Sequence, residues 1–408
     1  MIRAYEEKDL DQCLRMFQEV GWMEGDDSDK DSFSAFSSDS RVNVVELGGE
    51  AEVIALTRAG SMRYQEHEIP MAGVTGVVAS RVARTQGWPL RVTAHSIAET
   101  VEHGAAVSVL GMFDQGYYDK LGFGSLPYHR ITTVDPASFK VPKLSRSPIR
   151  LSKDDAKEIH ECRLRRMRVH GSCNMNGVGI TECDMTWDAK GVFGLGFRDD
   201  DGLLTHFVVC KPKDEHGPYY LAFMAYETYG QFIELLSLIK SLSVQVHGIR
   251  IADPPNIQLQ DFLDKPLASQ RARRGGDFDI NQNSSAWMQL RINNVETCVD
   301  AMSLPCESFS FHLKLNDPIE NFLSEKTSWR GESGNWIITL GKSSNATRGK
   351  DESLPTLEAT MSGFSRLWIG ALTASSLRAA GQINGDDSLL KQLDASLLLP
   401  KPAVDWDF

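Results

Sequence analysis

The chain has 408 residues, enough for two to four domains at ~100–200 residues each. Its 41% hydrophobic and 24% charged residues are typical of a globular protein, and no apolar run approaches the ~18 residues of a membrane span. The net charge of −12 argues against general binding to nucleic-acid phosphates. It favours cationic partners, unless it serves solubility alone.

The N-terminus and the cysteines indicate where the protein resides. Residues 1–13 are polar and lack the apolar core of a signal peptide, so we expect a cytoplasmic protein. The seven cysteines are scattered without a CxxC pair, and no histidine lies at a metal-ligand offset from them. We therefore expect reduced thiols, no disulfide framework and no metal site.

The first 125 residues predict an alternating α/β sheet. Apolar residues at helical spacing predict a helix over 8–20, and Pro89 in a first turn favours a helix over 88–103. The polar stretch 25–40 is either a loop or a helix pair around Phe33 and Phe36. Strands are expected at 1–5, 42–47, 52–58, 72–80 and 105–110, and a short helix at 115–121. This order is that of an acyltransferase-type sheet.

The middle of the chain repeats the opening in weaker form. After a linker at 134–147, residues 149–155 parallel residues 2–8, and each segment precedes a helix, which indicates a duplicated domain. Strands are expected at 203–211 and 219–224, a helix at 230–245, and a second linker at 269–285. Four arginines on a predicted helix favour a solvated or salt-bridged face over an RNA site: Arg163, Arg165, Arg166 and Arg168.

From Trp287 onward, short alternating strands and then helices predict an α+β module of about 120 residues. We expect strands at 308–314, 334–341 and 356–361, followed by helices at 364–370, 375–380 and 388–398. The chain then ends in two aromatic and two acidic residues, Val404–Phe408. Such an ending favours a docked terminus over a frayed one.

The strongest local motif is the segment 73–90, in which a buried strand runs into an Arg-x-x-Gly turn, Arg84–Gly87, and a helix follows at once. Unpaired backbone N–H groups and the helix dipole at such a turn bind anions. A coenzyme A pyrophosphate fits this geometry, and the strand edge at Val77–Ala79 fits the pantetheine amides. The alternative interpretation is an ordinary strand-to-helix turn.

Two further features bear on chemistry. A tyrosine phenol has a pKa of ~10 and a leaving thiol one of ~8.5, so Tyr117 or Tyr118 is able to protonate a departing thiolate. The alternative is that both tyrosines are packing aromatics. A buried C-terminal carboxylate is able to accept a proton or orient an ammonium group. The alternative is a docked tail with no catalytic part.

At these points the whole chain resembles the Eis (enhanced intracellular survival) family of GNAT N-acetyltransferases. Tyr118–Gly124 is similar to the family's Y-G-R-F-G-Y-G segment, and the chain ends in Asp-Phe, much like the family's acidic-Phe ending. Residues 287–292 and 362–370 resemble a sterol-carrier-protein-like domain. The resemblance implies tandem GNAT-like domains over 1–140 and 148–283, the second degenerate, and a sterol-carrier-like α+β domain over 286–408.

The resemblance also implies roles for individual residues. Tyr118 would be the general acid and the Phe408 carboxylate the base. A cationic substrate, an aminoglycoside or a lysine amine, would meet Trp22, Glu24, Asp26, Phe36 and Asp407, and the chains would form a homohexamer. Acetyl-CoA, the co-substrate, would lie against Val77, Val78, Ala79, Thr85, Gln86, Gly87, Trp88, Pro89, Leu90, Phe113 and Asp114.

The chain departs from the family pattern at Thr85-Gln86, where the family has more arginine, and at Pro89, which removes one N–H from the turn. We expect direct transfer without an acyl-enzyme, since no Cys or Ser sits beside a candidate base. The competing hypothesis is a scaffold protein with the same fold, which binds acetyl-CoA or lipid without turnover.

Overall fold

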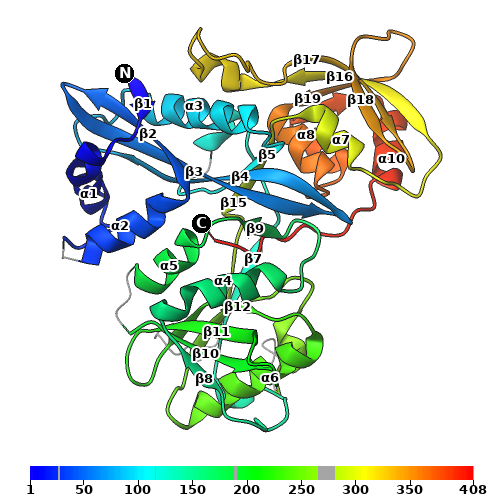
Figure 1. Cartoon of the computed structure of the whole chain (residues 1–408). Helices are drawn as coiled ribbons and strands as arrows, with labels where there is room; N and C mark the ends of the chain where they lie inside the picture. Colours follow the sequence, from blue (N-terminus) through cyan, green and yellow to red (C-terminus); the bar gives the residue numbers. More distant parts are fainter. Residues whose placement is uncertain (26–27, 115, 188–190, 265–280, 408) are drawn as a thin grey trace.

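The computed structural model describes residues 1–25, 28–114, 116–187, 191–264 and 281–407. Three sheets organise the chain (Figure 1). The first has eight strands in the order β1-β2-β3-β4-β5-β15-β6, with β9 pairing with β3. The second has seven strands, β14-β7-β13-β12-β11-β10-β8, and the third has five, β18-β17-β16-β19-β20.

The first sheet is built mostly from the N-terminal third, and the polar stretch before β2 forms a helix. Its elements are β1 (Ile2–Ala4), α1 (Leu10–Glu19), α2 (Ser28–Ser38), β2 (Ser40–Leu47), β3 (Glu50–Tyr64), β4 (His67–Ala79), α3 (Trp88–Glu102), β5 (Val107–Gly111), the 3₁₀ helix η2 (Tyr118–Leu121) and β6 (Gly124–Ser125). These elements follow the predicted order, with α2 added.

Helices cover both faces of this sheet. In α1, Cys13, Leu14 and Phe17 are buried because they recur at the three- and four-residue spacing that lines one helix face. They pack with α2 on side chains of β2 and β3 such as Val44 and Ile54. On the opposite face α3 packs on the neighbouring residues of the same strands, because successive strand residues point to opposite sides.

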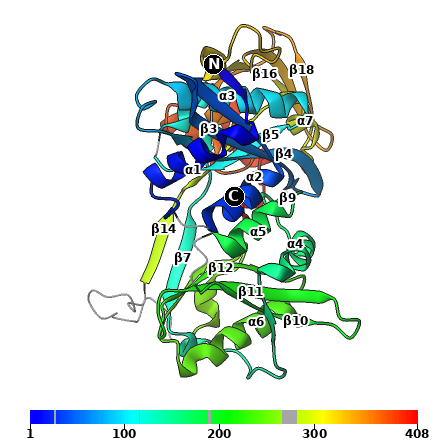
Figure 2. The ribbon, with the colours of Figure 1, turned by 60° about the vertical axis from the view of Figure 1, so that its left-hand side comes forward.

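The second sheet has one strand that the sequence did not predict. We expected a linker over 269–285; residues 281–285 instead form β14, paired antiparallel with β7, while 265–280 lie outside the described residues. Figure 2 shows the two strands side by side. This middle part of the chain contains β7 (His129–Val134), β8 (Ile149–Leu151), α4 (Ala156–Arg165), α5 (Gly179–Thr186), β10 (Phe193–Arg198), β11 (Leu204–Pro212), β12 (Tyr219–Ala225), α6 (Tyr229–Ser241) and β13 (Ile249–Ala252). It also contains β9 (Cys173–Met175), which pairs with β3 of the first sheet.

The third sheet carries its helices on one side, as an α+β module does (Figure 1). Strands β16 and β19 pair in parallel, and the other neighbours are antiparallel. This last part of the chain begins with β15 (Met288–Ile292), which belongs to the first sheet. It continues with α7 (Val295–Asp300), β16 (Phe309–Asn316), β17 (Gly334–Leu340), β18 (Asn345–Arg348), β19 (Thr356–Thr360), α8 (Met361–Trp368), α9 (Ala374–Ala379), β20 (Ile383–Gly385) and α10 (Asp387–Ser396).

Three strands cross the domain limits expected from the sequence. Strand β9 lies within the stretch 148–283, yet it pairs with β3 of the first sheet. Strand β7 lies within the stretch 1–140, yet it pairs with β13 and β14 of the second sheet. Strand β15 lies within 286–408, yet it is inserted between β5 and β6 of the first sheet. The three parts are therefore interlocked by exchanged strands.

A shared core joins the third part to the first. The Tyr64 ring of β3 stacks on the Trp368 ring of α8 at a centroid distance of 4.3 Å, and its hydroxyl donates to the Trp368 carbonyl at 2.9 Å. Inside the third part, a cavity of about 10 Å³ is lined by apolar side chains such as Phe364 and Leu393. That volume is about the size of one water molecule, so side chains fill this interior.

Candidate active site

Strands β4 and β5 separate at the centre of the first sheet. They pair in parallel up to Val74↔Leu110, after which β5 ends at Gly111 while β4 continues to Ala79 against β3 alone. In the part of the chain that the structure describes, no strand pairs with the β5-facing edge of β4 beyond Val74. The backbone of this edge is therefore available to an extended ligand.

A bulge at Gly76 bends β4 where the strands separate. The register with β3 shifts between Ile54 and Leu56, and Gly76 has φ +57°, which favours glycine. A Cβ at this position would lie 2.4 Å from Leu56 Cδ1, so the close approach also requires glycine. After the bulge Val78 is buried, and Val77 and Ala79 are half-buried.

The predicted Arg-x-x-Gly turn lies directly after this edge. Gly87 (φ +75°) is the N-cap of α3, and no side chain caps the helix there. Thr85 and Gln86 are exposed, and Thr85 has φ +63°, which is uncommon for a β-branched residue. The uncapped start of a 15-residue helix offers N–H donors and a positive dipole end to an anion.

The first turn of α3 contains the remaining predicted residues. Trp88 and Pro89 are half-buried and Leu90 is buried. Pro89 has no N–H, so the turn offers one donor fewer than an all-amide turn. Arg91 is exposed, with its guanidinium 5.8 Å from the Trp88 ring centroid, and Arg84 is also exposed. The turn therefore combines open backbone donors with positive charge, a donor set that fits a pyrophosphate.

Tyr118 lies at the base of the gap between β4 and β5. It begins the helix η2, is only 4% exposed, and packs with Val74, Leu90 and Leu110 in one core cluster. Its ring makes edge contacts with Tyr117 at a centroid distance of 5.0 Å. Burial raises the pKa of the Tyr118 phenol well above its usual value, with a smaller contribution from Tyr117. The phenol therefore holds its proton at neutral pH.

Phe113 forms an exposed aromatic wall beside Tyr118. It follows β5, is 69% exposed, and lies 5.9 Å from the Tyr118 ring centroid. Asp114 next to it is also exposed. Phe113 and Asp114 thus lie at the surface where β5 ends, next to the buried phenol.

The C-terminal segment is docked between the first two parts of the molecule (Figures 1 and 2). Asp405 accepts two bonds from Arg166, at 3.0 Å from Nε and 2.6 Å from Nη2, and one from the Cys173 N–H. The Trp406 ring is 1% exposed and lies beside Arg163, whose guanidinium carbon is 3.8 Å from the ring centroid. The predicted docking of the tail is confirmed up to Trp406, and Phe408 lies outside the described residues.

The backbone at His170 and Gly171 lies in close contact with residues 402–403 of the C-terminal segment. Gly171 has φ +88°, and a Cβ there would lie 2.7 Å from the Ala403 nitrogen, so the tail passes too close for any other residue. The Ala403 N–H donates to the His170 carbonyl at 3.0 Å. The tail is thus held by backbone contact as well as by charge.

Two of the residues predicted to meet substrate, Trp22 and Phe36, belong to one aromatic cluster, because both rings contact that of Phe17, at centroid distances of 5.5 and 6.1 Å. Trp22 is 47% exposed, and Glu24 beside it is exposed. Phe36 is buried, with its ring 5.2 Å from that of Trp187. Asp407 is exposed; burial, and after it the charge of Asp407, raises the pKa of Tyr220 in β12. Asp26 lies outside the described residues.

A cleft of about 260 Å³ opens between α1 and α2, next to the loop that carries Glu24. Arginine, lysine and aspartate side chains line it, among them Arg15, Asp29 and Lys30. Its charge is mixed, and it shares no residue with the cluster around Tyr118. Of the predicted site residues that the structure describes, none lines this cleft.

The predicted basic run also has a structural explanation. Arg163 and Arg166 are buried and ion-paired with Asp184 and Asp405, which bears out the salt-bridged alternative for these two arginines. They lie three positions apart and therefore share one helix face. The spacing of the two arginines, together with the acidic and aromatic residues at the end of the chain, could have predicted that these arginines bind the C-terminal segment. The sequence analysis did not make this prediction.

Comparisons with known proteins agree with this arrangement. Residues 1–126 match the family model described as Acetyltransferase (GNAT) domain, and residues 303–404 match that described as Sterol carrier protein domain. No curated protein matches the sequence. The protein is therefore an acyltransferase of the GNAT type, with a sterol-carrier-like domain at its C-terminal end. The predicted fold class is confirmed.

Solved structures share the fold over the whole chain. A probable N-acyltransferase from Enterococcus faecalis superposes with TM-score 0.79 at 17% identity, covering 100% of this chain and 99% of that one. A GCN5-related N-acetyltransferase from Anabaena variabilis gives TM-score 0.78 at 15% identity, with 100% of both chains covered. An Eis protein from Mycobacterium abscessus gives 0.76 at 13%, again with 100% of both covered.

Within the residues that the structure describes, no helix is long and apolar enough to cross a membrane. Over the same residues, no group of three or more His, Cys, Asp or Glu side chains is arranged to hold a metal ion.

Proposed function

We propose that this acyltransferase is an Eis-like N-acetyltransferase that moves an acetyl group from acetyl-CoA directly to an amine of a cationic substrate. The observation that carries the proposal is the position of Tyr118. Its buried, protonated phenol lies where β4 and β5 separate, beside the uncapped start of α3. A proton donor, a free strand edge and an anion-binding turn thus lie together.

The residues present fit acetyl-CoA, which supplies the acetyl group as a reactive thioester. The free edge at Val77–Ala79 would pair with its amide groups, and the turn at Thr85–Leu90 would take its pyrophosphate. Phe113 and Asp114 would border the ligand where β5 ends. The fit rests on the open backbone of the edge and on the uncapped helix.

Tyr118 would act as the general acid. As the new C–N bond forms and the C–S bond breaks, the phenol proton passes to the departing sulfur, and coenzyme A leaves as its thiol. The phenol is a weaker acid than the thiol (pKa ~10 against ~8.5), and burial raises the Tyr118 pKa further, so the transfer depends on close positioning of Oη and the phenolate regains a proton from solvent after each turnover. Acid–base help of this kind contributes roughly 10²–10⁴ in rate.

The Phe408 carboxylate would act as the base that takes the proton of the attacking amine. The anchoring of Asp405 on Arg166 and of Trp406 on Arg163 supports this role, because it holds the residues just before the terminus against α4 and β9. A free α-carboxylate has a pKa of ~3.3–3.7 and is a weak base in water. Removal from water would raise that pKa and strengthen the base.

The substrate class follows from charge. A net charge of −12 attracts cations over long range, which supports an aminoglycoside-like polyamine or a lysine amine. Trp22 and Glu24 are exposed beside the cleft loop and remain candidates for contact with substrate, as does Asp407. By resemblance we also propose a homohexamer, which light scattering would measure.

Release of coenzyme A tests the proposal. Acetyl-CoA would be supplied with kanamycin, neomycin, spermidine or a lysine peptide, using the intact chain, Tyr118→Phe, and a chain extended by one glycine after Phe408. We expect turnover by the intact chain, a drop of roughly 10²-fold or more in Tyr118→Phe, and loss on extension. Wild-type turnover in Tyr118→Phe would refute the proposed acid, and an active extended chain would refute the proposed base.

A scaffold that binds acetyl-CoA without turnover remains the alternative, and the missing N–H at Pro89 is the observation in its favour. A thermal shift with acetyl-CoA, but no thiol release with any amine, would support it. Within the described residues of the third part, the cavity lined by Phe364 and Leu393 holds about 10 Å³, far less than a lipid needs, which disfavours a lipid at this place.

A further inference from the structure

Strand β15 carries a row of polar side chains that lie wholly inside the protein. Gln289, Arg291 and Asn293 are each 0% exposed, although they alternate with apolar residues as the polar face of a half-exposed strand would. Burial of polar groups is unfavourable unless they are hydrogen-bonded. The partners of this row therefore indicate what it does.

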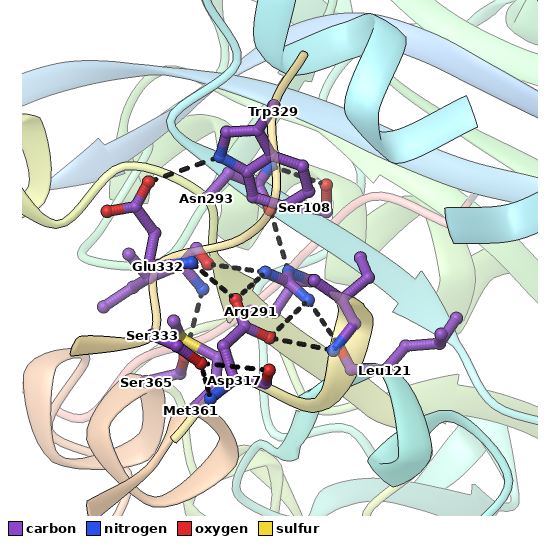
Figure 3. Close-up of polar contacts among 12 residues, drawn as sticks. Ser108, Leu121, Arg291, Asn293, Asp317, Trp329, Glu332, Ser333, Met361 and Ser365 are labelled. Atoms are coloured by element: carbon purple, nitrogen blue, oxygen red, sulfur yellow. Dashed lines mark hydrogen bonds and ion pairs between the residues drawn. The ribbon is translucent and has the colours of Figure 1, made fainter. Parts of the chain in front are cut away.

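Arg291 is fully occupied by partners (Figure 3). Its Nη2 lies 2.8 Å from Asp317 Oδ2, and both side chains are 0% exposed. Its Nε donates to Asn293 Oδ1 at 2.9 Å, and its guanidinium carbon lies 5.3 Å from the Trp329 ring centroid. A fork with this many fixed donors cannot rotate, so each group that it touches is fixed in turn.

One of those groups belongs to the helix that carries Tyr118. Arg291 Nη1 donates to the carbonyl of Leu121, the last residue of η2 (Figure 3). Gln289 Nε2, on the same face of β15, donates to Asp119 Oδ1 at 2.8 Å. The four-residue helix is therefore held at two points, one of which is the residue next to Tyr118.

The end of this helix also touches the third part of the chain. Gly122 has φ +81°, and a Cβ there would lie 3.0 Å from Met361 Cβ and 3.3 Å from Asp317 Oδ1. Asp317 in turn accepts the N–H of Glu332 at 3.0 Å. The Asp317 carboxylate thus binds two groups at once: the Arg291 guanidinium, which holds η2, and the backbone of the loop between β16 and β17.

We propose that Arg291 is the positioning residue for Tyr118. Arg291 fixes the C-terminal end of η2 through the Leu121 carbonyl, and Gln289 on the same strand fixes Asp119. Together these contacts set the orientation of the Tyr118 phenol. The inference rests on the proposed role of Tyr118 as general acid. It also gives the third part of the chain a task at the active site, because Asp317 holds Arg291 in place.

The position of an acid affects turnover more than binding. A misplacement of ~1 Å far from the chemistry can lower the rate ~10²-fold. Acetyl-CoA would meet the β4 edge and the α3 turn, neither of which Arg291 touches, so its affinity should not change. A role confined to packing would lower stability and leave the rate per folded molecule unchanged.

Two variants test the proposal. Arg291→Lys keeps a positive charge near Asp317 but lacks the planar fork. Gln289→Met removes the bonds from Nε2 to Asp119 Oδ1 and Ser125 Oγ and leaves the Arg291–Asp317 ion pair intact, so it should fold even where the first variant does not. We expect kcat to fall roughly 10-fold or more in Arg291→Lys and less in Gln289→Met, with unchanged KM for both substrates.

Two further readouts separate positioning from packing. Hydrogen exchange over residues 112–124 should quicken in both variants, because η2 loses a fixed contact. Burial raises the pKa of Tyr118. A looser η2 admits water, so the alkaline limb of the kcat–pH profile should move to lower pH. Leu393→Ala is the matched control, since it opens the core of the third part without touching η2.

The outcomes are distinguishable. Turnover in Arg291→Lys and Gln289→Met equal to that of Leu393→Ala, with unchanged exchange at 112–124, overturns the inference alone. Wild-type turnover in Tyr118→Phe overturns the proposed acid and the catalytic meaning of Arg291 with it. A fall in kcat in Tyr118→Phe and in Arg291→Lys, with faster exchange at 112–124, supports both.

Discussion

The guanidinium carbon of Arg163 lies 3.8 Å from the centroid of the Trp406 ring. On the same ring Arg166 contributes a second guanidinium at 5.0 Å, and its donors also hold Asp405. A desolvated arginine over a tryptophan face is a favourable contact. Asp405 and Trp406 are therefore bound by two arginines at the C-terminal end of α4, Arg163 in the helix and Arg166 directly after it.

Trp406→Ala should detach the tail. Replacing a fully buried tryptophan lowers the free energy of unfolding by about 3–5 kcal/mol, and the proposed base would lose its support. We expect faster trimming by carboxypeptidase and a fall in coenzyme A release. Leu398→Ala, at a site 79% exposed, is the control and should behave as wild type. Full activity in Trp406→Ala would mean that the tail has no part in turnover.

The Arg166–Asp405 pair should contribute to stability as a coupled unit. Its side chains are 6% and 11% exposed, and removal of either partner leaves a buried charge at a cost of about 3–5 kcal/mol. A double-mutant cycle by urea unfolding should show that both alanine substitutions together cost less than their sum. The exposed pair Lys314–Glu358 is the control, with an expected coupling of about 0.2–1 kcal/mol. A coupling that small at Arg166 would contradict the prediction.

Pro89→Ala should tighten acetyl-CoA binding. It restores one N–H at the start of α3, and a hydrogen bond to a charged group is worth about 1.5–3 kcal/mol, or roughly 10-fold or more in affinity. Calorimetric titration would measure the dissociation constant, and KM for the amine should not change. An unchanged acetyl-CoA affinity would show that this N–H does not reach the pyrophosphate.

The cysteines should react in two classes. Six of the seven are buried and Cys306 alone is partly exposed. Burial raises the pKa of Cys13, Cys162 and Cys210 to about 12, so these thiols carry little thiolate at pH 8. A thiol-reactive chromophore should label one group quickly in the native protein and all seven in denaturant. Rapid labelling of more than one would reveal local opening.

Stability should fall as the solution is made mildly acidic. Burial lowers the pKa of His160, His170 and His206 below their usual 6.5, so below that pH the unfolded chain binds more protons than the folded one. Each such histidine contributes up to about 1.4 kcal/mol per pH unit. Urea unfolding at pH 7.5 and 5.5 measures the difference, and His160→Gln should reduce it. A flat profile would contradict this prediction.

Much of the fold was predictable because its helices and strands follow from the spacing of apolar residues and from residues that favour helix starts. The helix over α3 follows from Pro89 in its first turn, and the strands of the first sheet follow from their apolar runs. The turn at Arg84–Gly87 was located from Gly87 beside a helix start, and the structure gives that glycine a positive φ. The placement of the remaining predicted site residues beside a ligand stays a prediction.

What the sequence by itself determined is the order of the elements and the faces that each one presents. Only the tertiary structure decided that β15 lies inside the first sheet and that its polar face is buried. The alternation of Met288–Asn293 predicts a strand with one polar face, but not what covers that face. Arg291 binds Leu121 and Asp317, which lie 170 and 26 positions away from it in the sequence. Local periodicity carries no information over such separations.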